Sequence, residues 1–129
     1  MLAAALCCGA FALSACTPPF RCDRVGGAPM LEYQLFFGRS NVSDSDWTNF
    51  TAQVITPSLP DGFTTLDAYG QWMNPDTQRI SGERTTVLIV AVPDTPTSTV
   101  AIARVKDEYR VRFRHIAVGT VIHPVCAAF

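Results

Sequence analysis

A row of polar side chains lies along one segment near the middle of the sequence. In FTTLDAYGQW, residues 63–72, the side chains of Asp67, Tyr69 and Gln71 alternate with apolar or small ones. If the segment is a strand, the three side chains project from one face in steps of about 7 Å, so a small ligand can touch two or three of them. We therefore take Asp67, Tyr69 and Gln71 as the candidate ligand-binding residues.

The same row suggests a catalytic site. A carboxylate beside an apolar wall can act as a general base, and a tyrosine can donate a proton or stabilise an oxyanion. His123 on the last predicted strand can share this face, as can Glu32 or Gln34 on the first, if the strand register permits. Asp67, Tyr69 and His123 are the catalytic candidates if the protein is an enzyme.

A purely structural interpretation of the row is simpler. Asp67 would then begin a bulge or turn near Gly70, and Trp72 would belong to the core. Tyr69 and Gln71 would be solvated or would contact a second copy of the chain. The sequence favours this interpretation over a functional one.

No other motif of catalytic or binding chemistry stands out. The sequence has no GxSxG motif of a nucleophilic serine and no glycine-rich phosphate loop. The two cysteines near the ends of the domain and the two histidines, His115 and His123, lack the CxxC or HxxxH spacing of metal ligands. A net charge of -1 and a pI of about 6.0 provide no basic surface for nucleic acid. We therefore expect no metal, no cofactor and no nucleic-acid partner.

The elements that would position these residues follow from hydrophobic periodicity and turn residues. Predicted strands cover residues 31–37, 63–72, 84–92 and roughly 116–124. One helix begins after a cap at Ser43 and stops at Pro57, and a second begins after a cap at Thr97 or Ser98. The order β-α-β-β-α-β predicts an α+β fold, the ferredoxin-like plait, in which two helices cover one face of a four-stranded antiparallel sheet.

The other face of that sheet needs apolar cover. Segment 84–92 is apolar on both sides, because Val87 and Ile89 alternate with Leu88 and Val90. A second copy of the domain is the simplest cover, which would give a homodimer through the open sheet face, of the dimeric α/β barrel kind. Shielding by the N-terminal segment and loops is the alternative.

The N-terminal segment has the composition of an export signal. MLAAALCCGAFALSAC carries no charged side chain, and as a helix it rises only about 24 Å, short of the roughly 30 Å core of a bilayer. It fits the apolar region of a signal peptide better than a membrane span. The segment can direct lipidation of the exported chain at Cys16 or ordinary secretion without a lipid. A third alternative is a hydrophobic helix that happens to end in cysteine.

Leu13-Ser14-Ala15-Cys16 resembles the lipobox of bacterial lipoproteins, although the usual basic residue after Met1 is missing. The resemblance implies cleavage after Ala15, lipidation of Cys16 and a lipid anchor in the cell envelope, on the periplasmic side. Thr17 replaces the Asp associated with retention in the inner membrane, which favours the outer membrane. The expected organisation is a signal peptide over 1–15, a Pro- and Gly-rich tether over 16–29 and a single domain over 30–129.

Cysteine usage agrees with export. Of the five cysteines, Cys7 and Cys8 leave with the signal and Cys16 carries the lipid. Cys22 and Cys126 remain at opposite ends of the domain, and an oxidising compartment favours a disulfide between them. Two free buried thiols are the alternative.

Several blocks in order resemble the short exported bacterial proteins grouped as domain of unknown function 3574. These blocks are FFGRS, VITPSLPDGFTTLDAYGQW, GERTTVLIV and PVCAAF, and the resemblance covers residues 31–129. The chain departs from the family pattern in FRHIAVGT, where His115 and Ile116 stand in place of a Gln-Glu pair. The resemblance implies export and a single domain but no particular activity.

Two functions of different classes follow. The first is a lipid-anchored, non-catalytic envelope protein that binds a small molecule, a peptide or another envelope protein. The second is a cofactor-free enzyme or haem-type binder of the dimeric plait kind, with Asp67, Tyr69 and His123 in a pocket between the sheet and its partner. The sequence favours the first.

Overall fold

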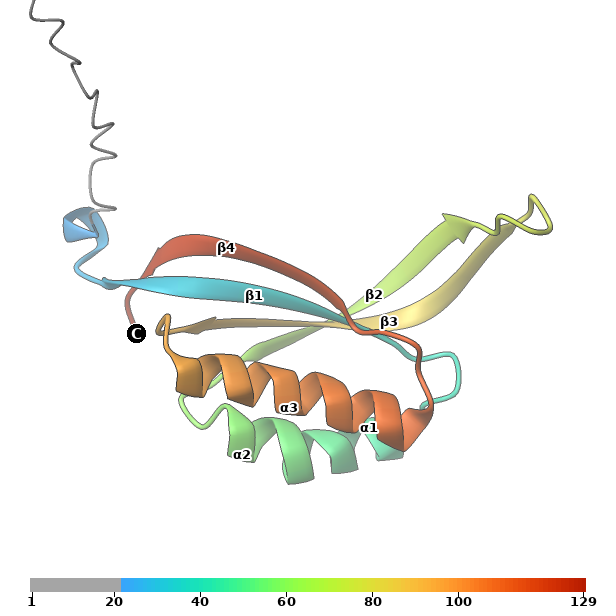
Figure 1. The fold of residues 1–129 in the computed structure, drawn as a ribbon, viewed down its shortest axis with the longest axis horizontal. Coiled ribbons are helices and arrows are strands. Elements are labelled where there is room, and N and C mark those ends of the chain that lie inside the picture. Colours follow the sequence, from blue (N-terminus) through green and yellow to red (C-terminus); the bar gives the residue numbers. More distant parts are fainter. Residues whose placement is uncertain (1–21) are drawn as a thin grey trace, which may run out of the picture.

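The computed structural model of the chain describes residues 22–129, which form a sheet with helices on one side (Figure 1). The predicted signal peptide, the lipidation site Cys16 and the first part of the tether lie outside the described residues. The strands are β1 (Ala28–Gly38), β2 (Thr64–Met73), β3 (Ile80–Val92) and β4 (Gly119–Ala127). The helices are α1 (Asp44–Phe50), α2 (Thr56–Ser58) and α3 (Pro96–Phe113). None of these helices is long and apolar enough to cross a membrane.

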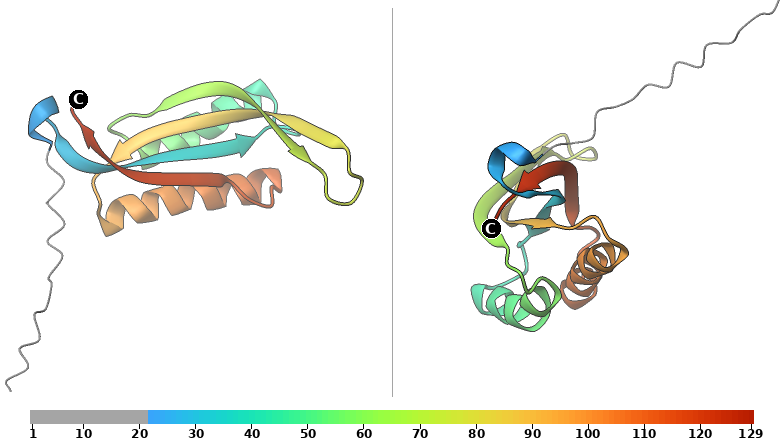
Figure 2. Two further views of the ribbon diagram at one scale, coloured as in Figure 1. Left: turned by 90° about the horizontal axis from the view of Figure 1, so that it is seen from above. Right: turned by 90° about the vertical axis from the view of Figure 1, so that its left-hand side faces the viewer.

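All neighbouring strands are antiparallel, and their order in the sheet is β2-β3-β1-β4. This order, with both helical segments on one face, is the predicted ferredoxin-like plait. The expected α+β fold is therefore confirmed. Figure 2 shows the helices lying side by side beneath the sheet.

The first helical segment begins as predicted. The Ser43 hydroxyl accepts a hydrogen bond from the Asp46 N–H at 3.1 Å, and the Asp46 carboxylate accepts one from the Ser43 N–H at 3.3 Å. This reciprocal capping satisfies two N–H groups that the helix leaves unpaired. A π-helical turn over Thr51–Ile55 joins α1 to α2. The segment ends at Ser58, one residue beyond the expected stop at Pro57.

The second helix begins earlier than predicted. Thr95 is its cap, not Thr97 or Ser98, and the Thr95 side chain accepts a hydrogen bond from the Ser98 N–H at 3.2 Å. Pro96 is the first helical residue, a position that suits its fixed φ and its missing N–H.

The core lies between the helices and the covered face of the sheet. Aromatic rings from β1, α1 and α3 pack edge to face at its centre, with ring centroids 4.8 Å apart for Phe37 and Tyr109 and 5.3 Å apart for Phe50 and Tyr109. Such pairs add about 0.5–1.5 kcal/mol beyond the burial of their area. The aromatic contacts hold both helices against β1.

A disulfide joins Cys22 to Cys126, with their Cα atoms 5.2 Å apart. It holds the start of the domain beside the end of β4, and β1 begins at Ala28, inside the stretch expected to be tether. Pro29 is tolerated there because β1 pairs only with β4 at this point, and pairing with β3 starts at Leu31.

The hairpin of β2 and β3 extends well beyond the helices (Figure 1). β3 begins at Ile80, within the stretch expected to be a long turn, and the connection shrinks to residues 74–79. The Asn74 side chain accepts hydrogen bonds from the N–H groups of Asp76 and Thr77, which closes the turn. The last strand begins at Gly119, three residues later than expected.

Candidate functional site

The predicted polar row lies on the helix side of β2. Asp67 pairs across the sheet with Thr86, whose side chain is buried in the core, so Asp67, Tyr69 and Gln71 share the covered side of the sheet. All three are exposed, because β2 is an edge strand and leaves the helices at this point. Four cavities within residues 22–129 are lined without any contribution from these three side chains.

Asp67 belongs to a network of charges. Its carboxylate lies 4.0 Å from Arg84, which contacts the Asp44 carboxylate at 2.7 Å. Arg39 contacts the same Asp44 oxygen at 2.7 Å, and the hydrogen bonds from Arg84 and Arg39 lower the pKa of Asp44. Asp67 itself is exposed beside Arg84, which is not the apolar wall expected around a general base.

Arg39 is the buried member of this network. It donates to the Ser43 carbonyl at 2.9 Å and to the Thr86 hydroxyl at 3.3 Å, and its guanidinium lies over the Trp47 ring, 5.5 Å from the centroid. These contacts fix the connection from β1 to α1. The arginine of the FFGRS block therefore has a structural role.

His123 lies on the opposite side of the sheet from Asp67 and Tyr69. It faces Glu32 on β1, and its Nε2 is 3.0 Å from Glu32 Oε1. Gln34 donates to the same oxygen at 3.0 Å. The proposed catalytic set of Asp67, Tyr69 and His123 therefore does not converge within one subunit.

Glu32, Gln34 and His123, which we call the Glu32 cluster, share a face, but not the face of Asp67. The sequence contained the signal for this, since Glu32 and Gln34 alternate with Tyr33 and Leu35, which point into the core. What the sequence lacked was the register that sets His123 opposite Glu32.

The side of the sheet that the helices leave uncovered, the open face, is largely apolar. Leu66 is 51% exposed, Trp72 47% and Val121 46%. The strand registers place these further apolar side chains on the same face: Met30, Phe36, Ala68, Val87, Ile89, Ala91 and Val125. Trp72, expected in the core, is here instead because it pairs with Ser81 and so shares the face of Leu66, opposite Gln71 and the helices.

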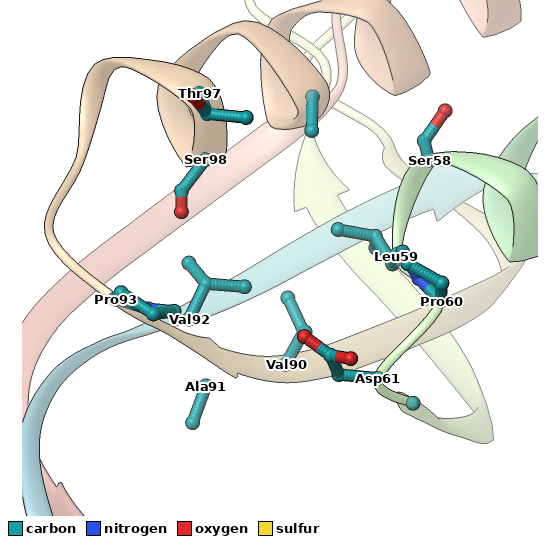
Figure 3. A pocket seen from close by; sticks show the side chains of 12 residues that line it. Ser58, Leu59, Pro60, Asp61, Val90, Ala91, Val92, Pro93, Thr97 and Ser98 are labelled. Atoms are coloured by element: carbon teal, nitrogen blue, oxygen red, sulfur yellow. The ribbon is translucent and has the colours of Figure 1, made fainter.

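A cavity of about 490 Å³, the end cavity, opens at one end of this face. Its lining includes Met30, Glu32, Asp61, Phe63, Ile89 and Phe129. A smaller cavity of about 190 Å³ adjoins it between the turn at residues 59–62, the end of β3 and the start of α3 (Figure 3). Within residues 22–129, no group of His, Cys, Asp or Glu side chains is arranged to hold a metal ion.

Comparison with known families identifies the chain. The family described as "Protein of unknown function (DUF3574)" matches residues 32–129. The chain belongs to this family. The resemblance inferred from the sequence blocks is therefore confirmed. No curated protein matches the chain significantly in sequence.

Solved structures show the fold elsewhere. A phage SAM lyase in complex with S-methyl-5'-thioadenosine is similar over 76% of this chain and 90% of that chain, with a TM-score of 0.55 and 11% identity. An amidase of the hydantoinase/carbamoylase family from Burkholderia multivorans is similar over 75% of this chain but only 27% of its own, with a TM-score of 0.28 and 11% identity. At these identities the first likeness concerns the fold alone, and the second carries no argument.

Proposed function

We propose that this DUF3574 protein is a lipid-anchored, non-catalytic binding module of the cell envelope, and that the open face is its binding surface. Lipidation at Cys16 would hold the domain on the periplasmic side, with the outer membrane favoured over the inner. The disulfide between Cys22 and Cys126 supports export, because such bonds form and persist in oxidising compartments.

The exposed apolar surface of the open face carries this proposal. Monomeric soluble proteins rarely leave large contiguous apolar patches in contact with water, and such patches mark interaction sites. Leu66, Trp72 and Val121 are each about half exposed on a face formed by all four strands. The face therefore has the properties of a surface that is covered by a binding partner.

A second copy of the chain is the partner that we propose for the centre of the open face. In a two-fold dimer each patch meets itself, so a charged centre would repel its own copy. The centre of this face, around Phe36, Leu66 and Val87, has no charged residue, and the titratable groups Glu32, Glu83 and His123 are placed around it. Self-association covers the apolar centre without pairing like charges.

Sedimentation measurements on the exported chain test self-association. We expect a dimer at micromolar concentration and a monomer for Leu66→Glu, which places a charge in the apolar centre. Val111→Glu is the matched control, because Val111 is 79% exposed on α3, away from the open face, and its variant should remain a dimer. A wild-type monomer at high concentration, or equal effects of both variants, would refute the proposed interface.

Membrane anchoring needs a separate measurement. The wild-type chain should be found with envelope membranes and should enter the detergent phase on partitioning, with an acylated residue 16 by mass spectrometry. Cys16→Ser should lose the acyl mass, whereas Cys8→Ser should keep it. An unmodified Cys16 in mature protein would exclude lipid anchoring and leave the open-face proposal standing.

A further inference from the structure

We infer that the end cavity binds a small organic cation with an apolar body, such as an alkylammonium amphiphile. This inference rests on the proposed function, since it names a ligand for one end of the open face. A cavity of about 490 Å³ is within the usual range of small-molecule sites. Its apolar walls come from the starts of β1 and β2 and the end of β3, including Met30, Phe63 and Ile89.

The charge of the lining selects the head group of the ligand. Glu32 and Asp61 both line the end cavity, and its lining contains no Lys or Arg. Figure 3 shows the Asp61 side chain extending from the turn toward β3, beside Val90. A cation would gain from both carboxylates, whereas a carboxylate or phosphate head would be repelled.

The Glu32 carboxylate is held in place for such a contact. Gln34 and His123 both lie 3.0 Å from its Oε1, and its side chain is only 26% exposed. Among residues 22–129 no donor contacts Oε2, so this oxygen can accept a hydrogen bond from a ligand N–H.

The position of the cavity favours an amphiphile. The cavity lies at the end of the sheet where β1 begins, the same end at which Cys22 is bonded to Cys126 (Figure 1). Cys22 is six residues after Cys16, and six residues span at most about 20 Å. A lipid on Cys16 would therefore hold this end near the bilayer surface, where amphiphilic molecules concentrate.

Binding of soluble octyl probes tests the inference. The full chain with Cys16→Ser, which carries no acyl groups, is titrated with octylammonium, octanoate and octanol while the methyl NMR signals of Met30 and Ile89 are followed. Octylammonium, which is protonated at neutral pH as a lysine side chain is, should bind at least about tenfold more tightly than octanoate. A further titration adds vesicles that contain phosphatidylethanolamine. These vesicles should not compete with octylammonium for the end cavity, because the lipid head group includes a phosphate.

Substitution of the carboxylate supplies the specificity test. Glu32→Gln should reduce octylammonium affinity about tenfold, whereas Asp107→Asn, on the outer side of α3, should leave it unchanged. The inference would be overturned if octanoate bound as tightly as octylammonium, or if Glu32→Gln had no effect on octylammonium affinity. It would also be overturned if the NMR shifts were confined to methyl groups other than those of Met30 and Ile89, or if the vesicles competed with octylammonium. The dimer and the membrane anchor are measured independently, so this failure would leave the proposed function intact.

Discussion

The Tyr109 hydroxyl donates a hydrogen bond to the Gly38 carbonyl at 2.6 Å, joining the C-terminal part of α3 to the end of β1. The two residues are 71 positions apart, and the ring of Tyr109 is buried among Phe37, Phe50 and Phe113. This one side chain therefore links the aromatic core to the backbone of the sheet.

Replacing this tyrosine should lower stability. Tyr109→Phe keeps the ring but leaves the Gly38 carbonyl without its donor, and we expect a loss of about 1 kcal/mol in the free energy of unfolding. Urea denaturation at pH 7 measures the difference. A stability equal to that of the wild type would mean that solvent replaces the lost donor at no cost.

The same residue should make the protein sensitive to alkali. Burial raises the pKa of Tyr109 above its ordinary value of 10.0, so above pH 10 the unfolded chain releases this proton while the folded one keeps it. The stability is therefore complete below pH 10 and falls as pH rises above it, by at most about 1.4 kcal/mol per pH unit. Denaturation curves between pH 9 and 11 should show a smaller slope for Tyr109→Phe than for the wild type.

Acid should weaken the charge network at the start of α1. The arginines Arg84 and Arg39 lower the pKa of Asp44 below its ordinary value of 3.8. The stabilisation is therefore present above pH 3.8 and is lost as pH falls through the lowered pKa. Asp44→Asn should flatten this part of the stability profile, and Asp107→Asn serves as control. An identical acid profile for Asp44→Asn and the wild type would contradict this account.

Loss of the disulfide should cost more than loss of any single hydrogen bond. The bond between Cys22 and Cys126 closes a loop over a sequence separation of 104, and the chain-entropy model gives about 4–5 kcal/mol for that length as an upper value. We expect Cys22→Ser with Cys126→Ser to lower the melting temperature clearly. Reducing agent should lower the wild type to the same level and leave the double variant unchanged.

The polar row on β2 should tolerate substitution. Asp67→Asn and Tyr69→Phe alter exposed groups, and substitutions at such positions usually change stability by no more than about 0.5 kcal/mol. Dimerisation and octylammonium binding should also be unchanged. A loss of cellular function with dimer and membrane anchor preserved would instead support the enzyme alternative.

The order of the elements could be predicted because each local pattern agreed with the fold. Leu31, Tyr33, Leu35 and Phe37 alternate as strand residues facing one core, and Ser43 with Asp46 marks the helix start. Local patterns could not show how far the hairpin of β2 and β3 extends beyond the helices. The start of β3, ISGE at residues 80–83, has no strand periodicity and is a strand because it pairs with β2.

The site was harder to predict than the fold. The alternation along β2 correctly separated Asp67 from Leu66, but only the register across four strands shows which side the helices cover. The Glu32 cluster depends on contact between residues 91 positions apart, Glu32 and His123, which no local pattern reveals.

The bond between Cys22 and Cys126 also holds the two ends of the domain next to each other. Because both ends meet at one edge of the sheet while the turn at 74–79 lies clear of the helices, a short peptide linking the ends would allow new termini at that turn. Such a circularly permuted chain would retain every core contact, and it would carry a fused reporter on the tip of the long hairpin.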